Sequence, residues 1–131
     1  MRKSIIAASV CVALVTAGAA LAKRDRNIPP EAIQIGKAQS CIPLTQIRES
    51  RVYGDRTIDF RVSGKKVYRN TLPYDCPSLG FEERFSYATS LSQLCSTDII
   101  TVLYSQGGGL SRGASCGLGE FQPVEIVKKP R

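Results

Sequence analysis

The stretch TIDFRVSGKKVYRNTL, residues 57–72, decides the fold of this chain. Its first six residues alternate between polar and apolar side chains, which predicts a strand that buries Ile58, Phe60 and Val62 and turns Asp59 outward. Ser63-Gly64 then supplies a tight turn, because glycine tolerates the positive φ angle that such a turn needs. Residues 67–72 form the next strand, so the stretch predicts an antiparallel hairpin.

The segment before this hairpin adds one more strand. Residues 47–53 have strand-like composition, and Gly54-Asp55 provides the turn that leads into the hairpin. Ile47 and Val52 fall on opposite faces of a regular strand, which predicts a bulge between them. The three strands together predict a meander.

Three further short strands are predicted over residues 85–87, 98–104 and 121–127. Residues 98–104 are apolar on both faces, which is typical of a central strand. Pro123 has no N–H to donate, so the first half of the last strand is expected at an edge or a bulge. Residues 106–115, with three consecutive glycines, are expected to form a mobile loop.

The predicted fold class is therefore all-β, a small antiparallel barrel-like domain of about six short strands. The main structural alternative is an amphipathic helix over residues 79–94, which Glu82, Glu83, Leu91 and Leu94 would fit. The sequence leaves this segment open between strand and helix.

The first 22 residues indicate a secretory signal peptide. Arg2 and Lys3 precede an apolar run that is short for a membrane span, and Ala20-Leu21-Ala22 is a small-x-small cleavage site. We expect a periplasmic or secreted chain that starts at Lys23. It would comprise a basic N-terminal arm (23–39), a disulfide-tied β domain (40–127) and a basic tail (128–131).

Four cysteines remain once Cys11 has left with the signal peptide: Cys41, Cys76, Cys95 and Cys116. An even number in an exported chain predicts two disulfides, and zinc or thioredoxin-like chemistry would favour closely spaced cysteines that this chain lacks. An up-and-down order of six strands favours the pairs Cys41–Cys95 and Cys76–Cys116. A helix over residues 79–94 would instead favour Cys76–Cys95 and Cys41–Cys116.

The positive charge is concentrated at the two ends of the expected mature chain. Residues 23–37 and 128–131 carry a net charge of +5, whereas residues 38–127 hold nine basic and nine acidic side chains. Within that neutral part, residues 44–70 are net basic, so Arg48, Arg61 and Lys65 form a candidate basic patch.

Export argues against nucleic acid as a partner, and the basic residues are not interleaved with the aromatic row that single-strand binders use. The tails are expected to give at most a weak, salt-sensitive contact with anionic surfaces. A monomer is expected, with an unidentified protein or envelope component as its partner.

The composition predicts no catalytic residue, no metal ligand and no cofactor. The chain has no histidine, which excludes Ser–His and Cys–His chemistry. Glu82 and Glu83 are adjacent and diverge on a strand or a helix, and Asp55 and Asp59 lie where aspartate commonly bonds local backbone. Gly107-Gly108-Gly109 lacks the Lys-Ser/Thr that follows in a phosphate-binding loop.

Short motifs around the four cysteines carry a resemblance. They are Cys41-Ile42, Ile47-Arg48, Asp55-Arg56-Thr57-Ile58, Tyr68-Arg69-Asn70-x-Leu72, Cys76-Pro77-x-Leu79, Leu94-Cys95-x-x-Asp98, Cys116-x-Leu118-Gly119 and Phe121. The pattern, over about residues 40–126, resembles a family of small exported proteobacterial proteins catalogued only as a domain of unknown function. The resemblance implies a secreted or periplasmic domain and brings no activity, cofactor or catalytic residue with it.

The sequence thus favours a non-enzymatic binding or envelope-associated module. An inhibitor of an extracellular hydrolase is the alternative, and a small enzyme without histidine chemistry is the third. A protruding loop with an acidic or aromatic tip would favour the inhibitor, whereas a concave groove would favour ligand binding.

Overall fold

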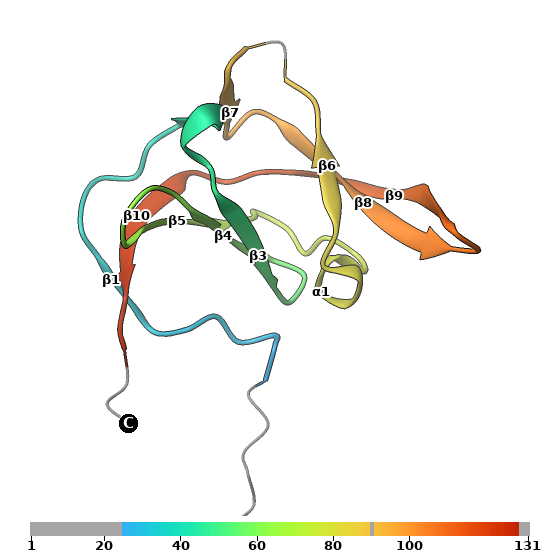
Figure 1. Ribbon diagram of the computed structural model, residues 1–131, viewed down its shortest axis with the longest axis horizontal. Coiled ribbons are helices and arrows are strands. Elements are labelled where there is room, and N and C mark those ends of the chain that lie inside the picture. The colour runs from blue at the N-terminus through green and yellow to red at the C-terminus, as the bar shows by residue number, and fades with distance from the viewer. Residues whose placement is uncertain (1–24, 90, 129–131) are drawn as a thin grey trace, which may run out of the picture.

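The computed structural model describes residues 25–89 and 91–128, so the expected signal peptide and the last three residues of the basic tail lie outside the described residues. Figure 1 shows strands arranged as three antiparallel sheets. The fold is mainly β, as predicted, but the described strands do not close into a barrel. The described residues contain ten strands where about six were expected, and several of the ten are only three residues long.

The large sheet has the strand order β1-β10-β5-β4-β3. Its members are β1 (Ala32–Gln34), β3 (Glu49–Tyr53), β4 (Thr57–Arg61), β5 (Lys66–Thr71) and β10 (Phe121–Ile126). The predicted meander β3-β4-β5 is its central feature, and the last strand returns to pair with β5.

Two smaller sheets complete the fold. The two-stranded sheet joins β2 (Cys41–Pro43) to β7 (Gln93–Cys95), with the 3-10 turn η1 (Leu44–Gln46) after β2. The three-stranded sheet has the order β6-β8-β9, with β6 (Phe85–Tyr87), β8 (Ile99–Gln106) and β9 (Gly109–Gly117). The central position predicted for residues 98–104 is therefore confirmed for β8.

Within residues 79–94 the strands are β6 and the start of β7, and most of the other described residues are irregular, so the helical alternative is wrong beyond one turn. That turn is α1 (Leu79–Glu82), which ends at Glu83 in the left-handed region with φ of 53°. Only Leu79 of this turn is buried, so a longer helix here would have had little apolar surface to bury.

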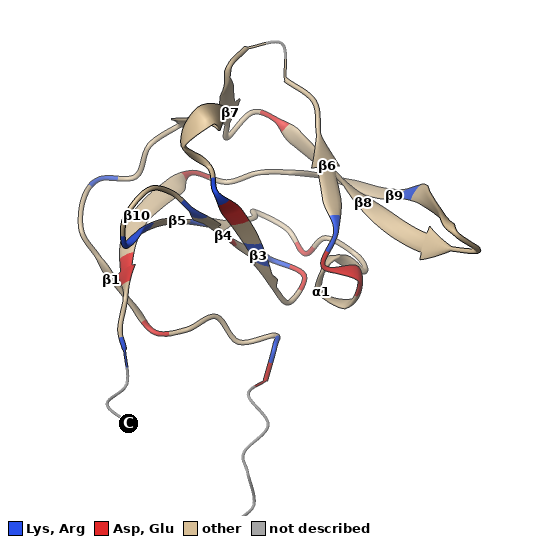
Figure 2. Cartoon of the chain, in the orientation of Figure 1, with Lys and Arg blue, Asp and Glu red and all other residues tan. Residues whose placement is uncertain are grey.

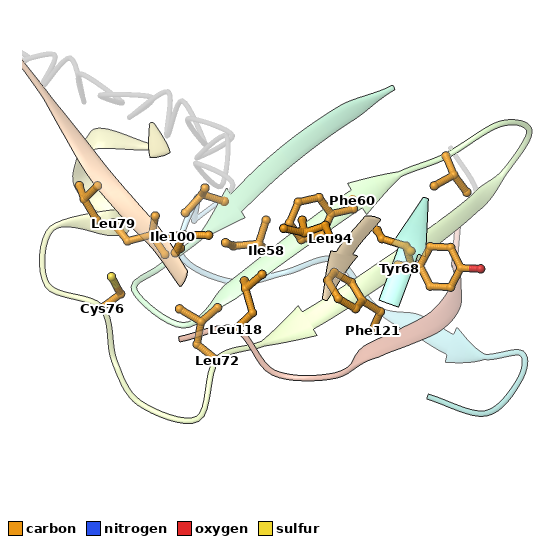
Figure 3. Packing of buried hydrophobic residues seen from close by; sticks show 14 residues of the cluster. Ile58, Phe60, Tyr68, Leu72, Cys76, Leu79, Leu94, Ile100, Leu118 and Phe121 are labelled. Atoms are coloured by element: carbon orange, nitrogen blue, oxygen red, sulfur yellow. The ribbon is translucent and has the colours of Figure 1, made fainter. Parts of the chain in front are cut away.

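The core lies where the three sheets meet (Figure 3). Phe60 of the large sheet packs edge-on against Phe85 of the three-stranded sheet, with ring centroids 6.3 Å apart, and against Phe121 at 5.6 Å. Ile42 and Leu94 bring the two-stranded sheet into the same cluster. Aromatic burial of this kind ties one sheet to the next.

Two expectations for the meander are corrected. No bulge interrupts β3, since its register with β4 is regular from Glu49 to Tyr53, and Ile47 lies outside the strand. Asp59 does point away from the core, but it is buried, because the arm crosses the outer face of the large sheet. The arm is held by β1, which pairs with β10, and by mutual backbone hydrogen bonds of 2.8 Å between Gln39 and Phe121.

Residues 106–115 are not a loop. Only Gly107 and Gly108 form the turn, both with positive φ, and β9 begins at Gly109. The predicted loop was wrong because β9 is rich in glycine and serine and buries little apolar surface, so its composition is typical of a loop. Eight consecutive residues, 105–112, are exposed along this hairpin.

Pro123 lies in an internal strand, between β5 and the arm. Its carbonyl accepts the N–H of Ile35 at 3.0 Å, but its own nitrogen has no hydrogen to return. The pairing of β10 with β1 therefore ends at Val124, whereas its pairing with β5 continues through Pro123. The irregularity predicted from Pro123 thus affects the contact with the arm.

The two disulfides are Cys41–Cys95 and Cys76–Cys116, the pairing that the sequence favoured. Cys41 and Cys95 lie directly opposite each other in β2 and β7. Cys76 is fully buried and fastens the segment after β5 to β9. Bridges of this kind are typical of proteins from oxidising, extracytoplasmic compartments.

Candidate functional site

A groove of about 470 Å³ opens at one end of the large sheet and contains two of the three residues of the predicted patch. We call it the basic groove. Its cations are Arg61, Lys65 and Lys128, its one acid is Glu125, and the rest of its lining is Ile33, Gly64, Val67, Ile126 and Val127. Figure 2 shows the basic segments of the β4–β5 turn close to the last residues of the described chain.

Local sequence explains how these cations converge. Arg61 is the last residue of β4, and the turn that follows uses the positive φ of Gly64, 77°, to bring Lys65 back over the strand ends. Lys128 follows β10. Because β10 runs antiparallel to β5, its C-terminal end lies beside the start of β5, next to the β4–β5 turn. Ile33 comes from β1 on the other side of β10.

Among the described residues, Arg61 has only a distant ionic partner. Its Nη1 lies 3.9 Å from Oε2 of Glu49, while the same carboxylate accepts a 2.8 Å hydrogen bond from Nε of Arg51. That hydrogen bond holds the pKa of Glu49 below its ordinary value, and the charges of Arg51 and Arg61 act in the same direction. Because Glu49 is engaged chiefly by Arg51, the guanidinium of Arg61 keeps hydrogen-bonding capacity for a ligand.

Arg48, the third predicted patch residue, lies next to the groove and not in its lining. Its backbone N–H donates to the carbonyl of Arg61 at 2.8 Å, and its side chain is exposed. The structure therefore brings Arg61 and Lys65 into one site and leaves Arg48 on its margin.

Sequence reasoning missed Lys128 and the apolar half of the groove. Lys128 was assigned to the tail, and only the antiparallel return of β10 shows that it lies beside Lys65. Ile33 and Val67 belong to strands that are distant in sequence, so their proximity depends on the order of the strands in the sheet. No local signal in the sequence would have indicated it.

The polar side chains of the cysteine motifs lie outside the basic groove, and several of them form hydrogen bonds with backbone groups. Asp55 accepts the N–H of Gly80 at 2.8 Å, and Asp98 accepts that of Cys95 at 2.7 Å. Nε of Arg56 donates to the carbonyl of Leu72 at 2.8 Å. Within the described residues, no buried side-chain nitrogen or oxygen lacks a hydrogen-bond partner.

The Asp59–Arg69 pair is the most buried ion pair between described residues. Arg69 donates from Nε and Nη2 to the two carboxylate oxygens at 2.8 and 2.9 Å, and Nη2 also donates to the carbonyl of Pro30 at 2.9 Å. The hydrogen bonds to Asp59 raise the pKa of Arg69, against the opposing effect of burial. This pair fixes the arm to the sheet.

In the part of the chain that the structure describes, no group of three or more His, Cys, Asp or Glu side chains could hold a metal ion. Over residues 25–89 and 91–128, no helix has the length and apolar character to cross a membrane. Glu82 and Glu83 flank the end of α1, with Glu83 exposed.

Comparison with family models, curated proteins and solved structures finds no match for this chain. The fold and the site therefore define its class: a disulfide-bonded, mainly β domain with a basic, partly apolar groove at one end of its large sheet.

Proposed function

We propose that this protein is a non-enzymatic, periplasmic or secreted module that associates with the cell envelope by contacting anionic lipid headgroups through the basic groove. The observation that supports the proposal is the convergence of Arg61 and Lys65 of the β4–β5 hairpin with Lys128, which is distant in sequence, beside exposed apolar surface.

The mixed lining favours a lipid surface over a soluble anion. Ile33 is 62% exposed and lines the groove, and Ile35, two residues further along the same arm, is 49% exposed. A surface that pairs cations with exposed aliphatic side chains suits the boundary between headgroups and acyl chains. Each Lys or Arg near an anionic membrane contributes about 1 kcal/mol of attraction.

The basic tail extends this surface in sequence. Lys129 and Arg131 lie within three residues of Lys128 in the sequence, so the charge that the sequence assigns to the tail continues from the groove. Exposed charges are screened over about 8 Å at physiological ionic strength, so the contact is weak and salt-sensitive.

The groove also bears on the inhibitor alternative. The hairpin of β8 and β9 protrudes, but its tip is Gly107-Gly108, which is neither acidic nor aromatic. A concave groove is the feature that separates ligand binding from inhibition, and it favours the binding module.

The test is co-sedimentation with vesicles of phosphatidylglycerol and phosphatidylcholine at low salt. The oxidised protein, residues 23–131, is compared with Arg61→Gln/Lys65→Gln, and with Arg84→Gln/Arg112→Gln, which removes the same charge from the other end of the fold. Binding should fall several-fold for the groove variant, remain close to wild type for the other, and vanish at high salt.

Equal loss in the two variants would mean that net charge alone attracts the protein, and the proposal would fail. Export is tested separately by intact mass. Secreted material should match residues 23–131 with two disulfides, and retention of residues 1–22 would contradict the proposed compartment.

A further inference from the structure

The outer face of the three-stranded sheet carries a second hollow, of about 480 Å³, at the other end of the molecule from the basic groove. Ser86, Ile99, Thr101 and Arg112 are among its lining residues. The proposed lipid contact does not involve this hollow, because the hollow and the basic groove share no lining residue.

Three hydroxyl side chains cross this face in a line, one from each strand. Ser86 of β6 lies opposite Thr101 of β8, and Thr101 lies opposite Ser115 of β9. The hydroxyls of Thr101 and Ser115 are 3.0 Å apart and hydrogen-bonded to each other. Neighbouring strands are about 4.8 Å apart, so the line extends across the full width of the three-stranded sheet.

A bulge in β9 places Arg112 on the same face. Thr101 pairs with Ser115 but Leu103 pairs with Arg112, so β9 has one residue more than β8 between these two pairs. Without that extra residue, Arg112 and Ser115 would point to opposite faces, because side chains alternate along a strand. Gly113 permits the bulge, since a Cβ there would overlap the ring of Tyr104.

Arg84 supplies a second cation across the sheet. Its carbonyl accepts the N–H of Leu103 at 3.0 Å, and it lies two residues before Ser86, so alternation puts both on one face. Arg84 and Arg112 flank Leu103 on either side and are therefore separated by about two strand spacings, roughly 9.5 Å. Both are exposed, and no ion pair within the described residues involves them.

Along β8, the face is therefore apolar at Ile99, carries the hydroxyl row at Thr101, and has an arginine on each side of Leu103. Ile99, 57% exposed, lies on one side of the hydroxyl row, and the two arginines lie on the other. Asp98 also lines the hollow, at the end next to Ile99, and one of its oxygens accepts the N–H of Cys95. An anionic group is consequently favoured on the arginine side of the hydroxyl row alone.

We infer that this face binds a carboxylate-bearing polysaccharide whose chain runs across the strands. Arginine recognises carboxylates with paired hydrogen bonds, and serine and threonine hydroxyls can both donate to and accept from sugar hydroxyls. Ile99 offers an apolar contact to the face of a sugar ring. A polymer that lies across the strands would meet hydroxyl groups from β6, β8 and β9 in succession.

The test is affinity electrophoresis and calorimetry with polygalacturonate, using the oxidised protein, residues 23–131. We expect binding to weaken at least tenfold in Arg84→Gln/Arg112→Gln and several-fold in Thr101→Val, which keeps the shape of the side chain and removes its hydroxyl. The matched control, Arg61→Gln/Lys65→Gln, should bind as the wild type does, and dextran, which is uncharged, should not bind.

Several results would overturn the inference: no detectable binding of polygalacturonate, equal weakening in the two double variants, an unaltered Thr101→Val, or equally tight binding of inorganic polyphosphate, since the last two indicate charge alone. Circular dichroism of each variant confirms that it is folded. Because the vesicle assay reports on the other end of the molecule, either proposal can fail without the other.

Discussion

The side-chain amide of Asn70 holds both backbone polar groups of Gly119, a residue 49 positions further along the chain. Nδ2 donates to the carbonyl of Gly119 at 2.7 Å, and Oδ1 accepts its N–H at 2.8 Å. Asn70 is fully buried, and a Cβ on Gly119 would overlap the carbonyl oxygen of Thr71. The two residues form a locked contact between β5 and the segment that leads into β10.

Asn70→Asp is expected to destabilise the fold strongly. The carboxylate keeps the shape of the amide but cannot donate to the carbonyl of Gly119, which leaves a buried acceptor facing a buried charge. A loss of about 3 kcal/mol is expected, at the upper end of the range for one unsatisfied buried group. Chemical denaturation measures it, with the exposed neighbour substitution Thr71→Ala as the control. A difference below 1 kcal/mol between the two would mean that the amide does not lock Gly119.

Breaking the buried Asp59–Arg69 pair is expected to lower the free energy of unfolding more than breaking an exposed ion pair on the same face of the sheet. Arg69→Ala would leave Asp59, 6% exposed, as an unpaired buried charge and would free the carbonyl of Pro30. Breaking a buried pair in this way costs about 3–5 kcal/mol, whereas an exposed pair such as Arg51–Glu49 contributes about 0–1 kcal/mol. Urea unfolding of Arg69→Ala and Arg51→Ala compares them, and similar midpoints would show that the arm does not cover the pair.

The disulfides are expected to differ in how much structure depends on them. Their loops span 54 and 40 residues, so chain entropy gives each about 4 kcal/mol and barely separates them. Cys41–Cys95 joins strands that are already paired, whereas Cys76–Cys116 fastens β9 to Cys76, which lies outside the strands. Thermal melts of Cys41→Ala/Cys95→Ala and Cys76→Ala/Cys116→Ala should show the larger loss in the second.

Full reduction should lower the melting temperature by more than about 10 °C. Coincident melts with and without reductant would mean that neither bridge is structural.

Glu49 provides a prediction about pH. Its pKa lies below the ordinary value of 4.5 because it accepts a hydrogen bond from Arg51. A carboxylate with a lowered folded-state pKa contributes stability above the unfolded-state value, and loses that contribution as the pH falls through the folded-state value. NMR titration of the Glu49 carboxyl should show a midpoint below 4.5 that rises in Arg51→Gln and is unaltered in Arg84→Gln. An unaltered midpoint in Arg51→Gln would contradict the assignment.

The elements that could be predicted from sequence are those marked by an alternation or a continuous run of apolar residues. The alternation of residues 57–62 located β4, and two-sided apolar character gave β8 its central position. β9 was missed because no apolar period marks it and because its partner, β8, supplies most of its hydrogen bonds. The order of strands in a sheet cannot be predicted from local sequence patterns. The burial of Asp59 beneath the arm and the position of Lys128 in the groove therefore could not be predicted.

The disulfide pairing shows the same limit. The pairs follow from an assumed up-and-down order of six strands, but the structure joins Cys41 to Cys95 because β2 and β7 are neighbours in a separate sheet. The pairing was right although the geometry behind it was different. Among the candidate site residues, Arg61 and Lys65 could be named because they lie on either side of one tight turn, Ser63-Gly64.

The two tails should contribute unequally to vesicle binding, although the sequence treats them alike. Deleting the arm would remove β1 and the carbonyl of Pro30 that Arg69 uses, so charge has to be removed by substitution instead. Lys23→Gln/Arg24→Gln/Arg26→Gln and Lys128→Gln/Lys129→Gln/Arg131→Gln each remove three positive charges. Because Lys128 lines the basic groove, the C-terminal variant should lose several-fold more binding to phosphatidylglycerol vesicles at low salt. An equal or greater loss in the N-terminal variant would show that the groove is not the surface that meets the membrane.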